Sequence, residues 1–189
     1  MRPDGSPDVA GSCGTGHATS DLILVYVKPN RNTKTPAAHR QPWRIHFFQR
    51  HAANDPAKVV PGREFLNACP DKVRMTMLAV LKAVAEAPPP QFSGGGKWKA
   101  MHGSMAGYHE VTVNGPNRHH YRLFCLLERD GGGLGLGGPS LVVLAGLDKA
   151  FMTTLSENDY AKVRSLGNEF WARNPRSVEP PKGSLPASS

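Results

Sequence analysis

The stretch that decides the fold is residues 108–128, which read YHEVTVNGPNRHHYRLFCLLE. Apolar residues recur with a period of two in Tyr108–Val113 and again in His119–Glu128, as is typical of half-buried β-strands. Between these two segments stands Asn114-Gly115-Pro116-Asn117, a run of residues that favour tight turns. The stretch therefore predicts two antiparallel strands joined by a short turn.

Three more segments of the chain have the composition of strands. Lys97–Met101 and Ser140–Leu147 flank the central pair and would extend it into an antiparallel meander, and Trp43–Arg50 precedes them all. The connection before the last strand, Asp130–Gly138, is rich in glycine and is expected to be a flexible loop.

The residues between the first strand and the meander predict two helices. Gly62–Asn67 has the pattern of a short helix, and a longer one is expected from Pro70 to about Glu86, where Pro88-Pro89-Pro90 ends it. The longer segment carries apolar residues at steps of three and four, which form one stripe along a helix. This stripe consists of Val73, Met77, Val80, Leu81 and Val84.

A third helix is expected after the meander. Ser156 suits an N-cap, and Glu157 and Asp159 place negative charge in the first turn. The apolar side of this helix would consist of Tyr160, Val163, Leu166 and Phe170. The predicted fold class is thus α+β, with an N-terminal strand and two helices packed on an antiparallel β-meander that is followed by a C-terminal helix.

Composition divides the chain into three parts. Residues 1–41 are mostly small and polar and are expected to be a largely disordered extension, although Leu22–Val27 could add a strand. Residues 42–175 form the predicted domain, and residues 176–189 are polar and proline-rich and are expected to be a flexible tail.

Charge, cysteine content and hydropathy narrow the function classes. The chain has 23 Lys and Arg against 15 Asp and Glu, a net charge of +8 that favours polyanionic partners such as nucleic acid. Its cysteines, Cys13, Cys69 and Cys125, are widely spaced, which argues against a disulfide framework or a zinc site and fits a reducing cytosol. No apolar run is long enough to cross a bilayer, so we expect a cytoplasmic protein.

Four segments resemble the RelE/HigB-like toxins of bacterial and phage-derived toxin–antitoxin systems. They are Pro61–Arg74, His109-Glu110-Val111, Tyr121-Arg122-Leu123-Phe124 and Val142–Lys149. The resemblance covers about Trp43 to Arg173. It implies a RelE-like fold, a ribosome-dependent endoribonuclease that cleaves mRNA without a metal or other cofactor, and a cognate helix-turn-helix antitoxin as partner.

The chain departs from this family at two positions where the family often has a positive charge. Thr112 stands where the family often has arginine, and Ala150 stands where it often has a second lysine. Lys97, Lys99, Arg118 and His102 are nearby in the sequence and could replace these charges. Otherwise the activity would be weakened or lost.

Cleavage of RNA by attack of a 2'-hydroxyl needs a base, an acid and positive charge at the phosphorane. Arg122, a charge in the middle of an apolar strand, is the predicted phosphate-binding residue. The alternative is that Arg122 pairs with Glu110 or Glu128 and has only a structural role.

The other candidate residues surround Arg122 in the predicted meander. Lys149 would be a second catalytic contact to phosphate, and His102 would transfer a proton. The predicted RNA-binding residues are Lys97, Lys99, Arg118 and Tyr108. The competing functions are a non-catalytic RNA-binding module and a regulatory protein that docks an antitoxin.

Overall fold

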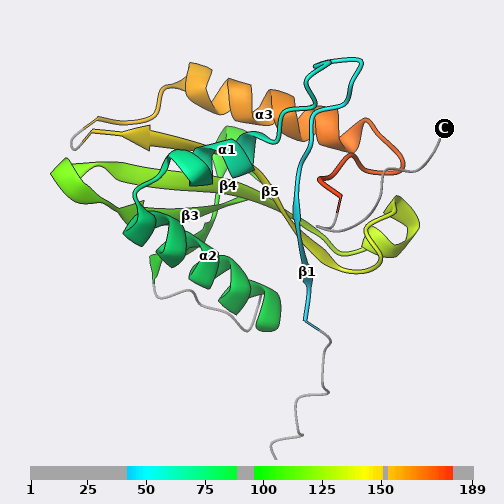
Figure 1. Ribbon diagram of the computed structural model, residues 1–189, viewed down its shortest axis with the longest axis horizontal. Coiled ribbons are helices and arrows are strands. Elements are labelled where there is room, and N and C mark those ends of the chain that lie inside the picture. The colour runs from blue at the N-terminus through cyan, green and yellow to red at the C-terminus, as the bar shows by residue number, and fades with distance from the viewer. Residues whose placement is uncertain (1–41, 89–95, 151–152, 181–189) are drawn as a thin grey trace, which may run out of the picture. The chain divides into compact units, whose positions relative to one another are not determined.

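The computed structural model describes residues 42–88, 96–150 and 153–180, which form a five-stranded sheet with three α-helices (Figure 1). In chain order the elements are β1 (Arg44–Phe47), α1 (Pro61–Ala68), α2 (Asp71–Glu86), β2 (Trp98–Ala100), β3 (Tyr108–Asn114), β4 (His120–Glu128), β5 (Ser140–Lys149) and α3 (Glu157–Trp171). Short 3-10 turns occur at η2 (Gly103–Met105), η3 (Pro116–Arg118) and η4 (Gly131–Leu134). The predicted α+β class and the order of the elements are confirmed.

The strands are arranged in the order β1-β5-β4-β3-β2. Strands β2 to β5 form the predicted antiparallel meander, and β1 joins it as a parallel neighbour of β5. The turn between β3 and β4 contains Asn117 and Arg118 in the left-handed region, with φ of 55° and 58°. Asparagine tolerates this conformation better than most residues, which suits it to the turn.

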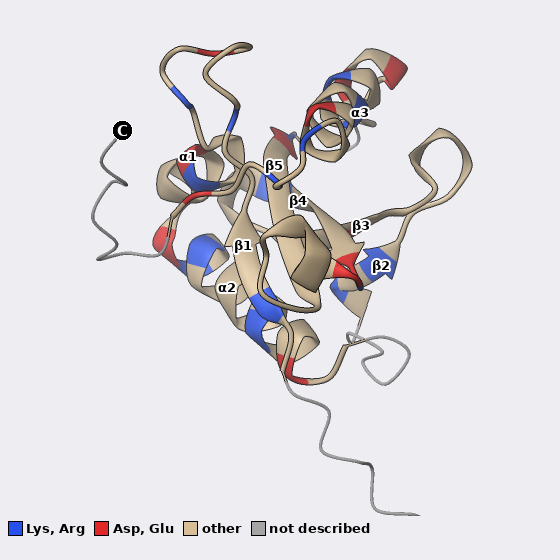
Figure 2. Cartoon of the chain, turned by 90° about the vertical axis from the view of Figure 1, so that its right-hand side faces the viewer, with Lys and Arg blue, Asp and Glu red and all other residues tan. Residues whose placement is uncertain are grey.

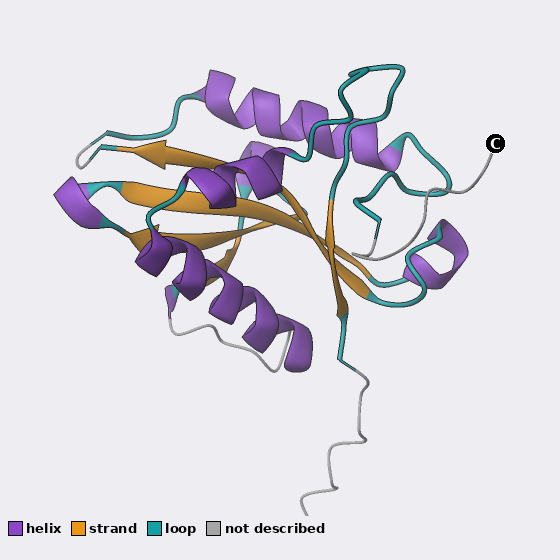
Figure 3. Cartoon of the chain, viewed as in Figure 1, coloured by secondary structure: helices purple, strands orange, loops and turns teal. Residues whose placement is uncertain are grey.

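Helices α1 and α2 cover one face of the sheet and α3 covers the other (Figures 1 and 3). Each face has its own apolar core, because side chains alternate along a strand. On the side of α1 and α2, Val111, Leu123 and Val143 are fully buried. On the side of α3, Phe124 and Leu144 are fully buried.

The predicted helical patterns are confirmed. The apolar stripe of α2 is buried, and α1 begins at Pro61, where a helix needs no backbone N–H from its first residue. Helix α3 begins with a capping box, in which the Ser156 hydroxyl accepts from the Asp159 backbone N–H and the Asp159 carboxylate accepts from the Ser156 backbone N–H.

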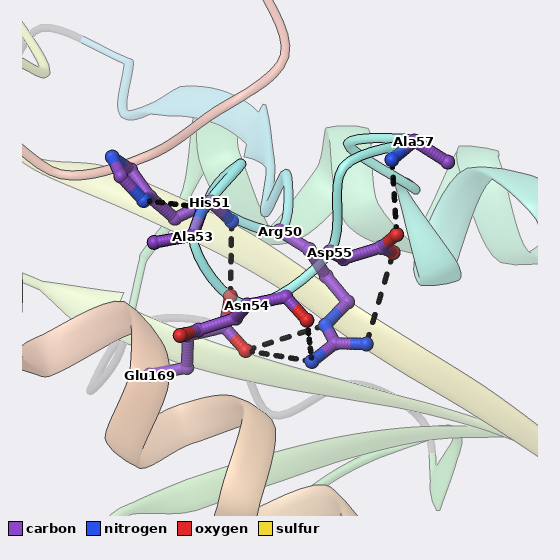
Figure 4. Close-up of polar contacts among 7 residues, drawn as sticks. All are labelled: Arg50, His51, Ala53, Asn54, Asp55, Ala57 and Glu169. Carbon is purple, nitrogen blue, oxygen red and sulfur yellow. Dashed lines mark hydrogen bonds and ion pairs between the residues drawn. The ribbon is translucent and has the colours of Figure 1, made fainter.

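A cluster of polar side chains connects the segment that follows β1 with α3 (Figure 4). The Glu169 carboxylate accepts from the Arg50 guanidinium at 3.3 Å and from the His51 backbone N–H at 2.9 Å. Arg50 also forms an ion pair with Asp55, at 3.7 Å. Only 9% of the Glu169 side chain is exposed, so the carboxylate depends on these partners.

Residues 176–179, which lie beyond the predicted domain boundary at residue 175, contact the domain. Val178 bridges to Phe48, the Glu179 backbone N–H donates to the Phe47 carbonyl at 2.8 Å, and the Glu179 carboxylate pairs with Arg63 at 2.6 Å. The segment 176–179 therefore belongs to the domain, because its backbone pairs with the outer edge of β1.

The loop between β4 and β5 is more ordered than its glycine content predicted. It forms η4 and buries Leu136, which is 1% exposed, in the core on the α3 side. The anchoring leucine gives the loop an apolar contact that the glycine pattern alone does not reveal.

The predictions for residues 1–41, including Leu22–Val27 and Cys13, lie outside the described residues, as does the tail from residue 181. Cys69 and Cys125 are buried free thiols. Among the described residues, no helix combines the length and apolar character needed to span a membrane.

Candidate functional site

A group of polar side chains lies at the end of the sheet where β3 and β5 finish, on the side of α3. We call it the polar face. It consists of Lys97 and Lys99 of β2 and its N-terminal flank, Glu110 and Thr112 of β3, His120 and Arg122 of β4, and Lys149 of β5. Their neighbours Trp98, Val111 and Leu123 point the other way, into the core beneath α1 and α2.

A β-bulge brings Lys149 to the polar face. The register shifts between Phe124 and Cys125, so that β5 has one extra residue at Leu144. Before the bulge, Leu141 and Val143 face α1 and α2. Without the extra residue, Lys149 would have the same orientation as these two, since a shift of one residue reverses every later side chain.

Arg122 is held by Glu110 on the same face. The Arg122 Nη1 atom donates to the Glu110 carboxylate at 2.9 Å, and 31% of the Arg122 side chain is exposed against 9% of that of Glu110. The pairing that sequence analysis left open is therefore present, with Glu110 as the partner. Arg122 keeps part of its guanidinium fork open, and Glu110 fixes the direction in which it points.

Lys149 is paired with the first turn of α3. Its Nζ atom lies 3.2 Å from the Asp159 carboxylate. Hydrogen bonds from the backbone and hydroxyl of Ser156, and then the contact with Lys149, lower the pKa of Asp159 to about 2. The capping box thus places an ionised carboxylate beside Lys149, which fixes the lysine against the sheet.

His120 belongs to the polar face, although the sequence pattern did not single it out. It lies opposite Lys149 in the register, and its Nδ1 atom lies 2.7 Å from the Asn114 side-chain oxygen. An amide oxygen only accepts, so this contact favours the tautomer that donates from Nδ1, in which Nε2 is the acceptor nitrogen. The period of two, counted from Arg122, could have identified His120.

A groove of about 1060 Å³ adjoins the polar face. Lys97, Lys99, Thr112 and His120 line it on the sheet side, and residues near the start of α2 line its other side. The prediction that Lys97 and Lys99 share one face of their strand is confirmed, because the side chain between them, Trp98, is buried. Figure 2 shows the basic residues on β2.

The structure does not bring His102 to the polar face. Met101 pairs with Tyr108 at the opposite end of β3 from Thr112, and His102 follows it into η2. Four residues of strand at roughly 3.3 Å each put it more than about 13 Å from the Arg122 row. His102 therefore lies outside the polar face.

Tyr108 also drops out of the candidate site. It is 3% exposed, its ring packs edge-on against Trp171 and it lies beside Gly167 of α3. Burial raises its pKa. Its role is in the core, because α3 covers the surface that it would need for RNA. Arg118, by contrast, is exposed in the η3 turn, at the same end of the sheet as the groove.

The two positions that lack the family's positive charge differ in their surroundings. Thr112 lies opposite Arg122 in the register, and its buried hydroxyl makes no hydrogen bond to any described residue. Ala150 is exposed just after β5. The described cations at this end include Lys97 and Lys99 at β2, Arg118 in η3, Arg122 of β4 and Lys149 of β5.

Comparison with known proteins was made by family model, by curated sequence and by solved structure. None of the three gives a match. Among residues 42–88, 96–150 and 153–180, no three His, Cys, Asp or Glu side chains are grouped closely enough to hold a metal ion.

Proposed function

We propose that the chain is a toxin of the RelE/HigB-like kind, which cleaves mRNA on the ribosome. The observation that carries this proposal is the placement of Arg122 and Lys149. They are diagonal neighbours on adjacent strands, and such Cα atoms lie roughly 7–8 Å apart. Two cations at this spacing suit the phosphate of a single nucleotide step.

The polar face supplies groups for metal-free cleavage. His120 Nε2 takes the proton of the 2'-hydroxyl, whose oxygen bonds to the phosphorus while the bond to the 5'-oxygen breaks and water protonates that oxygen. Arg122 binds the phosphorane oxygens, and Lys149 makes a second contact to them. Glu110 acts as a positioning residue through Arg122. In this proposal His120 replaces His102.

A second function is favoured by the ion pairs. Arg122 and Lys149 are both bound by carboxylates, which compete with phosphate for the same donors. A non-catalytic RNA-binding or antitoxin-docking protein needs cations only for attraction and tolerates this competition.

The test is single-turnover cleavage of mRNA on isolated ribosomes. Arg122→Ala is expected to slow cleavage roughly a hundredfold, because a preorganised charge at the phosphorane is lost. Arg122→Lys recovers part of the rate, since lysine keeps the charge without the two-pronged geometry. Arg63→Ala is the control, because it breaks an Arg–Glu pair on the opposite side of the sheet whose arginine is about as exposed as Arg122.

Stability must be measured beside the rate. Arg122→Ala leaves the Glu110 carboxylate buried and unpaired, which costs about 1–3 kcal/mol. The double variant Arg122→Ala with Glu110→Gln removes this cost and keeps the loss of cleavage. If the folded double variant cleaves at the normal rate, Arg122 has no catalytic role, and if the unmodified protein binds ribosomes without cleaving mRNA, the second function stands.

The proposal includes a partner and a place of action. A helix-turn-helix antitoxin would cover the polar face wholly or partly, and the ribosome places the activity in the cytoplasm. Co-expression of the antitoxin with the chain should restore growth and yield a stable complex.

A further inference from the structure

The groove beside the polar face has an uneven charge. Three lysines line it: Lys72 near the start of α2, and Lys97 and Lys99 at β2. No aspartate or glutamate is among its described lining residues. A groove that concentrates one sign of charge attracts a ligand of the opposite sign, here an anion.

These three lysines also differ from the cations of the polar face in their pairing. Lys72, Lys97 and Lys99 are exposed and form no ion pair with any described residue. Arg122 and Lys149 each have a carboxylate partner. The groove lysines can therefore bind an anion without first giving up an internal contact.

The groove is continuous with the polar face. Lys97, Lys99, Thr112 and His120 belong to both. Lys72 and Thr76 line the groove from α2, on the other side of the sheet. Figure 2 shows basic residues on both β2 and α2. The short β2 makes this possible, because its ladder with β3 ends at the bond from the Thr112 backbone N–H to the Lys97 carbonyl. A chain bound at Arg122 can thus pass around the edge of β3.

We propose that this groove holds the single-stranded RNA that flanks the cleaved phosphate, with Lys72 as a backbone contact far from the reaction. The inference rests on the proposed function, and it adds a substrate path across the edge of the sheet. The polar lining consists of lysines, threonines, asparagine and histidine, with no described Phe, Tyr or Trp on which a base could stack. The groove therefore contacts phosphates and sugars and binds RNA without preference for the base sequence.

The test is direct binding of a fluorescent oligouridine with 2'-O-methyl sugars, which cannot be cleaved, followed by anisotropy over a range of KCl concentrations. Each lysine that neutralises one phosphate of a single strand contributes about 0.7 to the salt slope, or roughly fivefold in affinity near 0.1 M salt. Lys72→Ala is expected to reduce the salt slope by about 0.7 and the affinity roughly fivefold. The triple variant that also carries Lys97→Ala and Lys99→Ala is expected to reduce the salt slope by about 2.

Lys82→Ala is the matched control, because Lys82 is an exposed lysine of the same helix that pairs with Glu86 and does not line the groove. Its affinity and slope should equal those of the unmodified protein. If Lys72→Ala behaves like Lys82→Ala, or if the unmodified protein does not bind the oligonucleotide, the RNA does not use the groove and the inference is overturned. If poly-glutamate at the same concentration of charges displaces the RNA and binds more tightly, the inference is overturned in favour of an acidic protein partner.

Binding and cleavage fail separately. If the chain binds the oligonucleotide through Lys72 yet leaves ribosomal mRNA intact, the proposed RNA-binding groove stands and the proposed nuclease activity is contradicted. If cleavage depends on Arg122 and neither binding nor cleavage changes in Lys72→Ala, the nuclease activity stands and the RNA-binding groove is contradicted.

Discussion

At the residue scale, His109 shows how a side chain of the candidate region serves packing. Its ring stacks on Trp98 at 5.0 Å, and its buried Nδ1 atom has no hydrogen-bond partner among the described residues. Burial lowers the pKa of His109, because a charged imidazole is poorly solvated there. The His109 ring thus packs as an aromatic side chain would, on the side of α1 and α2, away from the polar face.

This burial predicts a loss of stability in mild acid. The unfolded chain binds a proton at His109 below about pH 6.5 whereas the folded chain resists it, so the free energy of unfolding falls as the pH drops below that value. His109→Phe should reduce this slope and gain roughly 1 kcal/mol at neutral pH, because the unpaired nitrogen is gone. His46, whose pKa burial also lowers, contributes to the slope that remains. If the free energy of unfolding, measured with urea, falls equally for the unmodified protein and for His109→Phe between pH 7 and about pH 5, the assignment is contradicted.

At the element scale, α1 lies so close to β5 that the strand needs a glycine. A Cβ atom added at Gly146 would come within 1.9 Å of the Phe65 ring. Gly146 follows the bulge and faces α1, so the close approach of the helix and the orientation of Lys149 depend on the same stretch of β5.

Gly146→Ala is therefore expected to cost about 1–3 kcal/mol in the free energy of unfolding, because the Phe65 ring or the whole of α1 must move. Gly132→Ala is the control. A Cβ atom there meets nothing within 4 Å, and the change should stay within roughly 0.5 kcal/mol of zero. Equal urea midpoints for the two variants would show that α1 adjusts without cost.

At the scale of the whole domain, β1 and the residues that follow it contact two segments that are distant in the sequence. Arg50, which follows the strand, binds Glu169 of α3, and the segment 176–179 pairs with the outer edge of the strand. The strand itself has only four residues, Arg44–Phe47, so these contacts add much of what holds it.

Two shortened chains test this role of the last described segment. A chain that ends at Pro180 keeps the Glu179–Arg63 pair and the two backbone hydrogen bonds between 176–179 and residues 47–49, and one that ends at Pro175 loses them. We expect the second to be less stable by roughly 2–4 kcal/mol, at about 1 kcal/mol net for each hydrogen bond lost. The same melting temperature for both chains would mean that 176–179 is dispensable and that the predicted boundary at 175 was correct in energetic terms.

The helices and strands could be predicted from the amino-acid pattern alone, because their signals are local. The stripe from Val73 to Val84 has the period of a helix, the turn at Asn114–Asn117 separates two segments with a period of two, and Ser156 with Asp159 marks the start of α3. This pattern also predicted that Lys97 and Lys99 share a face, since alternation along a single strand needs no other part of the chain.

Which of the candidate residues meet depends on how the strands pair in the folded chain. The bulge at Leu144 turns Lys149 toward Arg122, and no residue pattern in β5 signals where an extra residue is inserted. Pairing of β3 with β4 selects Glu110 over Glu128 as the partner of Arg122 and brings His120, rather than His102, to the polar face. These outcomes depend on register between strands, a property of two segments at once that neither segment carries alone.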